Sequence, residues 1–465
     1  MKKKIILLLM TTVLSLNVVG CAAGSSNEKT NSDGSASKTT DSLMGEQTVV
    51  VVGDDWGPAV TTTIIHFNET VDSSSISANT FTVSETKESF NYEALSEDFE
   101  GDPSEHIEVT NARTVVDSYT CDENGNKTDS SEYVAIKLSY NPDEGNPFCY
   151  DIFTWHNTIC NPYKLNVSLN DGQSLTTTNG DTISSINVNP SIDLDLDKAI
   201  YPQLDKSNLS GTYTSDDGYT LTYGSYAPEE DGNKHPLVIW IHGAGEGGTQ
   251  NEIAVLGNEV TALYSEEFQN VMGGAYVLTP QTKTFWLTYN EEGDWADNPG
   301  VDSIYLESLK GLIDDYIAKN ENIDTDRIYI GGCSNGGYMT MDMVLNYPDF
   351  FAAAFPICEA YADSGISDAQ LEGIKDLPIW FVYANNDTTV IPENYEIPTI
   401  ERLQAIGADV HTSVFEDVHD TSGRFTGEDG QPYQYMGHWS WLYFFNNDCE
   451  ENGVKLWDWL ASQSK

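Results

Sequence analysis

Hydrophobic positions in the first half of the chain follow the pattern of short β-strands. From residue 48 to residue 189, runs rich in Val, Ile, Thr, Tyr and Phe alternate with breaks of Gly, Asn, Asp and Pro, and no helical period interrupts them. Many short strands with turn residues between them are typical of a β-sandwich. The sequence therefore predicts an all-β sandwich domain over residues 48–200. Its clearest strands are residues 49–52, 61–65, 80–83, 133–138 and 163–167.

The pattern changes near residue 205 to alternating strands and helices. Residues 237–241 form a continuous apolar run, which is typical of a strand buried on both faces of a parallel sheet. Apolar residues between 305 and 317 recur at three- and four-residue spacing, as on one face of an amphipathic helix. This order predicts an α/β domain with a mainly parallel sheet over residues 205–465. Further core strands are expected at residues 275–278, 327–330, 352–357, 379–383 and 410–415.

The beginning of the chain has the pattern of an export signal. Lysines directly after Met1 precede an apolar run, ending at Val19, that is too short for a membrane span. Cys21 follows in a context that resembles a bacterial lipobox, whose cysteine carries a two-chain lipid anchor. We therefore expect a signal peptide at residues 1–21, a flexible polar linker at residues 22–47 and an extracellular protein held to the membrane by lipid alone. A plain signal peptide with an incidental cysteine is the alternative.

The net charge narrows the range of partners. The chain has 22 Lys and Arg against 73 Asp and Glu, a formal net charge of −51. A surface of this sign repels nucleic acid and anionic membranes, so we expect neither as a partner, while neutral esters remain open as substrates. The composition does not indicate an oligomeric state.

The cysteines do not form a recognisable framework. Besides Cys21, three lie in each half of the chain, at positions 121, 149, 160, 333, 358 and 449. An odd number per domain leaves room for at most one disulfide in each, and Cys149 with Cys160 or Cys121 is the pairing that we consider. No zinc spacing is present, and we predict neither a metal nor a cofactor.

Gly332-Cys333-Ser334-Asn335-Gly336 fits the G-x-S-x-G pattern of a serine nucleophile. In this pattern the serine occupies a strained turn between a strand and a helix, and its small neighbours allow the two elements to approach each other. An apolar strand precedes the motif, and residues 338–345 have the composition of a helix. Ser334 is therefore the predicted nucleophile, and a purely structural Gly-rich turn is the alternative.

A serine hydroxyl needs a base, and the base needs an acid that orients it. In the α/β-hydrolase fold the chain order is serine, then acid, then histidine. Asp387 comes directly after a predicted strand and is the expected acid, with capping of a turn as its alternative role. For the base, His438 is favoured because Gly437 allows a tight approach and aromatic neighbours would hold the ring. His419, directly after the last predicted strand, stays open as the alternative base.

A glycine-rich segment after the first core strand is suited to hold an oxyanion. His242-Gly243-Ala244-Gly245-Glu246 lies where the hydrolase fold places one backbone donor, and the residue after the nucleophile supplies the second. We expect the N–H groups of Ala244 and Asn335 to form the oxyanion hole, with Gly243 as the next choice for the first donor. A phosphate-binding loop is disfavoured because the segment lacks the lysine of that motif.

The second half of the chain resembles a known family. Residues 236–251, 277–281, 323–329, the turn at Ser334 and residues 437–441 are similar to bacterial esterases related to feruloyl esterases and polyhydroxybutyrate depolymerases, a group also labelled predicted peptidases. The resemblance implies an α/β-hydrolase that works through an acyl-enzyme, with Ser334, Asp387 and His438 matching the triad. The chain departs from the family by an insertion of about twenty residues, rich in Asp and Gly, at 417–434.

The first half resembles the immunoglobulin-like domain that precedes the catalytic domain in some bacterial esterases, particularly at residues 55–60. Together the halves predict a secreted serine esterase that acts on small-molecule or polymer-linked esters, such as feruloyl or acetyl esters. A serine peptidase and a non-catalytic cell-surface binding protein are the alternatives. Aromatic residues that could line an acyl cleft, or equally pack in the core, are Phe285, Trp286, Tyr289, Trp295, Trp439 and Trp441.

Overall fold

The computed structural model describes residues 42–96, 99, 101–102, 104–290, 293 and 301–465, and these belong to one compact unit. The predicted signal peptide at residues 1–21, the lipidation site Cys21 and most of the predicted linker lie outside the described residues, as does Trp295. In the part of the chain that the structure describes, no helix is long and apolar enough to span a membrane.

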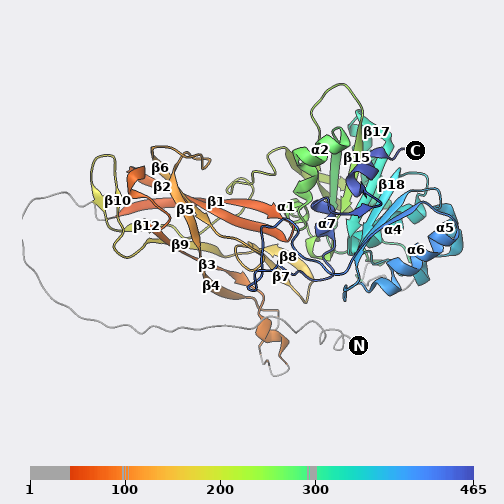
Figure 1. Cartoon of the computed structure of the whole chain (residues 1–465), viewed down its shortest axis with the longest axis horizontal. Coiled ribbons are helices and arrows are strands. Elements are labelled where there is room, and N and C mark those ends of the chain that lie inside the picture. The colour runs from red at the N-terminus through yellow and green to blue at the C-terminus, as the bar shows by residue number, and fades with distance from the viewer. Residues whose placement is uncertain (1–41, 97–98, 100, 103, 291–292, 294–300) are drawn as a thin grey trace, which may run out of the picture. The chain divides into compact units, whose positions relative to one another are not determined.

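The N-terminal domain is a sandwich of two antiparallel-rich sheets, coloured red to yellow in Figure 1. Five strands in the order β12-β1-β2-β6-β5 form one sheet, and three in the order β4-β3-β9 form the other. Buried β-branched and aromatic side chains from both sheets fill the space between them. This confirms the predicted fold of the first half. The strands are β1 (Leu43–Asp54), β2 (Gly57–Asp72), β3 (Phe81–Ser89), β4 (Ile107–Arg113), β5 (Val115–Cys121), β6 (Ser130–Leu138), β7 (Phe148–Asp151), β8 (His156–Ile159), β9 (Tyr163–Leu169), β10 (Leu175–Thr176), β11 (Thr182–Ile183) and β12 (Ile186–Val188).

The sandwich begins earlier than predicted. Strand β1 starts at Leu43, whereas we placed the end of the flexible linker at residue 47. Leu43 is fully buried and pairs with Ile186 of β12, and Gly45 pairs with Phe67 of β2. The sequence did not indicate this strand, because the residues around it are polar. Its start at Leu43 depends on pairing with Ile186, which lies far along the chain.

The second domain is built on an eight-stranded sheet in the order β13-β14-β16-β15-β17-β18-β19-β20. The six neighbouring strands β16, β15, β17, β18, β19 and β20 pair in parallel. Strands β13 and β14 add an antiparallel edge. The predicted α/β class with a mainly parallel sheet is confirmed. The strands are β13 (Ser207–Thr214), β14 (Thr220–Tyr226), β15 (His235–Ile241), β16 (Tyr276–Gln281), β17 (Ile323–Cys333), β18 (Ala353–Ile357), β19 (Ile379–Ala384) and β20 (Val410–Phe415).

Helices cover both faces of this sheet, so its central strands are apolar on both sides. Alternate residues of β15 show this: Leu237 and Ile239 belong to one core cluster, and Val238 and Trp240 to the other. The labelled helices of this domain lie around the sheet in green to blue in Figure 1. They are α1 (Asn251–Leu256), α2 (Glu266–Met272), α3 (Leu306–Lys319), α4 (Asn335–Asn346), α5 (Asp368–Gly373), α6 (Glu396–Ala405), α7 (Trp441–Phe445) and α8 (Leu456–Ser462).

The insertion at residues 417–434 packs against the N-terminal domain. Arg424 forms an ion pair of 2.6 Å with Asp54, at the end of β1, and the ring of Phe425 lies 5.9 Å from that of Trp56. The hydroxyl of Tyr433 donates to Asp143 at 3.1 Å. The segment that departs from the resembling family therefore joins the two domains.

Asp55 is the buried centre of this interface. Its side chain is fully buried, and its carboxylate accepts hydrogen bonds from Tyr435 Oη at 3.4 Å and from Asn446 Nδ2 at 3.2 Å. Burial raises the pKa of Asp55 to about 6, although the bond from Asn446 opposes this. In the unfolded chain an aspartate has a pKa of about 3.9.

This pKa difference predicts how the Asp55→Asn variant responds to pH. Between about pH 4 and pH 6 the folded protein keeps a proton on Asp55 that the unfolded chain has lost, so the contribution of Asp55 to stability falls as the pH rises. Asparagine does not titrate. We expect the free energy of unfolding of Asp55→Asn, relative to the original protein, to increase from pH 4 to pH 6 and then level off. Urea unfolding of both proteins at several pH values measures this, and a difference that does not change with pH would contradict it.

The six cysteines that the structure describes are all buried and unpaired. The disulfide that we considered between Cys149 and Cys160 or Cys121 is therefore wrong. Burial raises the pKa values of Cys121 and Cys149 to about 11. These cysteines act as small core residues.

Candidate active site

Ser334 lies at the junction of β17 and α4, as the motif predicts. Its backbone has φ 56° and ψ −116°, a strained conformation for a residue with a side chain. The flanking glycines permit this turn: a Cβ on Gly332 or Gly336 would collide with the carbonyl oxygen of Ile241, and one on Gly336 would lie 2.6 Å from that of His242. The glycines therefore allow β15 and α4 to approach each other and hold the serine at the carboxyl end of the sheet.

Asp387 and His438 are brought together although 51 positions separate them. Asp387 follows β19, and its Oδ2 accepts a hydrogen bond from His438 Nδ1 at 2.7 Å. Its Oδ1 accepts the N–H groups of Thr389 and Val390 at 2.8 and 3.0 Å, which fixes the carboxylate. With the proton held on Nδ1, the Nε2 of His438 is the nitrogen that can accept a proton.

The loop that carries His438 needs the glycine before it. A Cβ on Gly437 would lie 2.5 Å from the carbonyl oxygen of Asn386, so only glycine lets the histidine and aspartate loops meet. The ring of Trp441 lies edge-on to His438 at 5.7 Å. Both features match the reasons for which His438 was favoured in the sequence.

His419 lies in a different environment. Its Nδ1 interacts with Asp417 at 2.7 Å and with the hydroxyl of Tyr443 at 3.4 Å, and its side chain is 42% exposed. The structure thus pairs Asp387 with His438 and gives His419 a separate carboxylate. The catalytic roles of all these residues stay predictions.

The segment after β15 presents Ala244 at the start of a 3-10 turn, η4 (Ala244–Glu246). The N–H of Gly243 donates to the Glu246 carboxylate, so Gly243 is a poorer candidate for the oxyanion donor than Ala244. Asn335 is the first residue of α4, and the first N–H groups of a helix have no acceptor within it. A Cβ on Gly243 would lie 3.4 Å from Cys333 Sγ, so the two predicted donor segments are in contact.

The side chain of His242 is hydrogen-bonded to this segment. Its Nδ1 donates to the carbonyl of Gly243 at 2.6 Å, and its Nε2 accepts the N–H of Thr282 at 3.2 Å. Burial lowers the pKa of His242 to about 4, so the ring is neutral near pH 7. A neutral ring can donate from one nitrogen and accept at the other, as both contacts require.

The described aromatic residues that were proposed for an acyl cleft lie in three different environments. Trp286 is fully buried beside His242, with ring centroids 5.3 Å apart, and Trp441 is buried as well, so both pack in the core. Tyr289 and Trp439 are partly buried against the core clusters. Phe285 contacts His156 of β8 with the rings tilted and their centroids 4.6 Å apart, a contact between the two domains.

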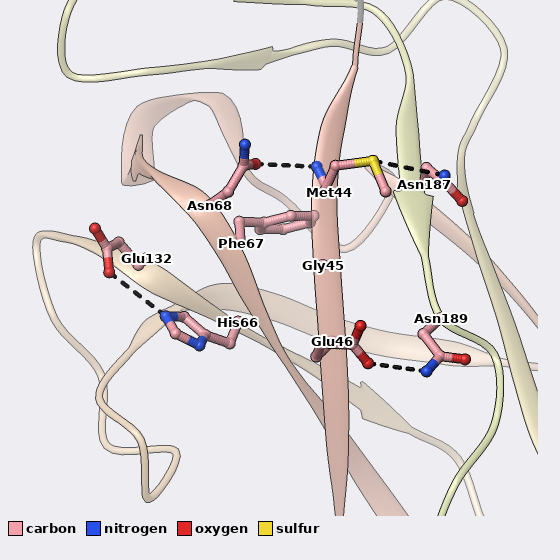
Figure 2. A pocket seen from close by; sticks show the side chains of 9 residues that line it. All are labelled: Met44, Gly45, Glu46, His66, Phe67, Asn68, Glu132, Asn187 and Asn189. Atoms are coloured by element: carbon pink, nitrogen blue, oxygen red, sulfur yellow. Dashed lines mark hydrogen bonds and ion pairs between the residues drawn. The ribbon is translucent and has the colours of Figure 1, made fainter.

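A pocket of about 580 Å³ lies elsewhere, on the N-terminal domain (Figure 2). Its polar side chains already pair with each other: Glu46 with Asn189, His66 with Glu132, and Asn68 with the N–H of Met44. Among the described residues that line it, none is a predicted catalytic residue. The pocket therefore does not bear on the predicted chemistry.

Two buried carboxylates near the site gave no signal in the sequence. Glu359 and Glu396 are fully buried, and burial raises the pKa of Glu359 to about 8 and that of Glu396 well above its usual value. A Cβ on Gly337 would contact Glu359, which places Glu359 against the nucleophile turn. In the described part of the chain, no group of three or more His, Cys, Asp or Glu residues is arranged to hold a metal ion.

Comparisons with known proteins agree with this architecture. Residues 46–184 match the model of the esterase Ig-like N-terminal domain, and residues 312–419 match the prolyl oligopeptidase family. A solved structure of a thermostable esterase superimposes with a TM-score of 0.67 and 25% identity, covering 90% of this chain and 99% of that one. The chain is related to serine esterases of the α/β-hydrolase fold. The resemblance inferred from the sequence is thereby confirmed.

Relatives with curated names cover parts of the chain. A poly(3-hydroxyalkanoate) depolymerase C from Paucimonas lemoignei is 30% identical over 130 residues, which is 26% of this chain and 27% of the depolymerase. A probable carboxylesterase SOBER1-like from Arabidopsis thaliana is 27% identical over 207 residues, which is 41% of this chain and 70% of that protein. The feruloyl esterase B of Neurospora crassa is 28% identical over 149 residues, covering 32% of this chain and 45% of the relative. These similarities support the predicted enzyme class, a serine ester hydrolase.

Proposed function

We propose that this chain hydrolyses carboxylic esters through an acyl-enzyme on Ser334. The observation that carries the proposal is the 2.7 Å hydrogen bond from His438 Nδ1 to Asp387, which leaves Nε2 available as a base in the domain that holds the serine in a strained turn. The relatives, which are named carboxylesterase, feruloyl esterase and depolymerase, support an ester as the substrate.

In this mechanism the oxygen of Ser334 attacks the ester carbonyl carbon and its proton passes to His438 Nε2. The N–H groups of Ala244 and Asn335 hold the negative charge that develops on the carbonyl oxygen. Collapse of the tetrahedral intermediate expels the alcohol, which takes the proton from His438. Water then attacks the acyl-serine with His438 again as the base, and the carboxylic acid leaves. Asp387 keeps the imidazole in the required tautomer throughout.

The substrate class that we propose is a small or polymer-linked ester with a feruloyl, acetyl or similar acyl group. The names of the relatives support this range, and a net charge of −51 favours neutral substrates over anionic ones. The prolyl oligopeptidase match at residues 312–419 supports a second candidate, a serine peptidase on the same triad.

A substrate panel separates the two candidates. The purified chain would be assayed with p-nitrophenyl acetate, methyl ferulate, an acetylated xylo-oligosaccharide and a series of peptide p-nitroanilides. We expect kcat/KM to be larger for the esters than for every peptide. Turnover of a peptide with no turnover of any ester would instead make the chain a peptidase.

We also propose that the protein is exported and anchored to the membrane through a lipid on Cys21. The basic start, the short apolar run and the small residues around Cys21 support this. Fractionation of cells that express the full chain tests it: the protein should be in the membrane fraction, and Cys21→Ser should move it out. Equal distribution of both proteins would end the proposal.

A further inference from the structure

A hairpin of the N-terminal domain contacts the loop that presents Ala244. Strands β7 and β8 form this hairpin, and Asn157 on β8 donates from Nδ2 to Glu246 Oε1 at 3.3 Å. A Cβ on Gly245 would lie 2.8 Å from Asn157 Nδ2, and one on Gly247 would lie 2.7 Å from His156 Nε2. The loop thus has glycine at the two positions where the hairpin approaches it most closely.

Glu246 links this contact to the predicted oxyanion donor. The side chain is 5% exposed, and besides Asn157 its carboxylate accepts the N–H of Gly243 and its own N–H. Gly243 and Glu246 lie on either side of Ala244 in the chain, so the carboxylate fixes the turn on both sides of the predicted oxyanion donor. A charged acceptor forms stronger hydrogen bonds than a neutral one. Burial raises the pKa of Glu246 to about 7, and the bond from Asn157 favours its ionised form.

We propose that Asn157 is a positioning residue for the oxyanion hole, so that the N-terminal domain completes the active site of the hydrolase domain. The inference rests on the proposed ester hydrolysis. Asn157 touches no reacting atom in this account: it holds Glu246, and Glu246 holds the turn that carries Ala244. An oxyanion donor acts mainly on the transition state, so a displaced donor lowers kcat more than it changes KM.

The Asn157→Leu variant tests the proposal, because leucine has a similar size and no donor. With p-nitrophenyl acetate we expect kcat to fall by about 10-fold, less than the loss from deleting an oxyanion donor outright, while KM changes by less than about 2-fold. An aryl trifluoromethyl ketone, which forms an oxyanion on the serine, should bind more weakly by a similar factor. Thr158→Val, at the exposed neighbouring position of the same strand, is the matched control and should keep the original kcat.

A double-mutant cycle with Glu246→Leu, which removes the acceptor, separates this role from a general effect on packing. If Asn157 acts through Glu246, then Asn157→Leu should cost less than about 2-fold in kcat in the Glu246→Leu background. An equal loss in both backgrounds would overturn the proposal, as would a kcat of Asn157→Leu equal to that of the original protein. If Asn157→Leu does not fold, as judged by circular dichroism, Asn157→Ser gives the same comparison. Absence of ester turnover in the original protein would instead reject the proposed function itself.

Discussion

Ser334→Ala is expected to lower kcat for p-nitrophenyl acetate by at least about 10⁴-fold. The methyl group cannot attack a carbonyl. The neighbouring thiol of Cys333 is buried, and burial raises its pKa well above the usual value, so it should not replace the serine. Because alanine is smaller than serine and Ser334 is only partly buried, the fold should tolerate the change. The residual rate should come from the oxyanion donors and substrate binding alone.

Two controls make this result specific. Ser464→Ala, at an exposed position near the C-terminus, should keep the original activity. Thermal unfolding of Ser334→Ala followed by circular dichroism should match that of the original protein, so that a loss of rate cannot be attributed to unfolding. A Ser334→Ala protein that folds and retains the original kcat would show that another residue is the nucleophile.

The second large effect is expected at His438. Replacing it by alanine removes the base that takes the proton from Ser334, so kcat should fall by about 10⁴-fold or more. His419→Ala is the matched control, since it removes the other histidine considered for this role. His419 has its own partner in Asp417 and is partly exposed, so we expect its loss to change kcat by less than about 3-fold.

The pair of variants decides between the histidines. An inactive His419→Ala protein beside an active His438→Ala protein would reverse the assignment. Loss of activity in both would mean that the loop that contains His419, residues 417–434, is also needed. This loop holds Arg424 against Asp54 of the N-terminal domain, so thermal unfolding of both variants should be followed in parallel.

The sequence was sufficient to predict the positions of those site residues that lie at the ends of strands. Ser334 follows an apolar strand and precedes a helix, and Asp387 follows another apolar strand, so a parallel sheet brings both to one edge. The choice of His438 rested on Gly437 and on the aromatic residues beside it. The structure gives a physical reason for both: a side chain at position 437 would collide with Asn386, and the ring of Trp441 packs edge-on against His438. These features are local in the chain, which is why they were predictable.

Features that depend on contacts between distant segments could not be predicted. Asn157 and Glu246 are 89 positions apart, and Asp55 and Tyr435 are 380 apart, with no periodicity that relates them. The early start of β1 at Leu43 also depends on a distant partner, Ile186. The disulfide was wrong for a related reason, since the sequence gives cysteine counts but not their packing in an apolar core.

The most direct test of the account is covalent labelling of the intact chain with a fluorophosphonate. This reagent reacts with a serine that an adjacent base has activated and leaves a mass that can be located by peptide mapping. We expect one adduct per chain, on the peptide that contains Ser334, and much slower labelling of His438→Ala. An adduct on another residue would contradict the triad of Ser334, Asp387 and His438. Complete absence of an adduct would also contradict it and would favour a non-catalytic binding protein.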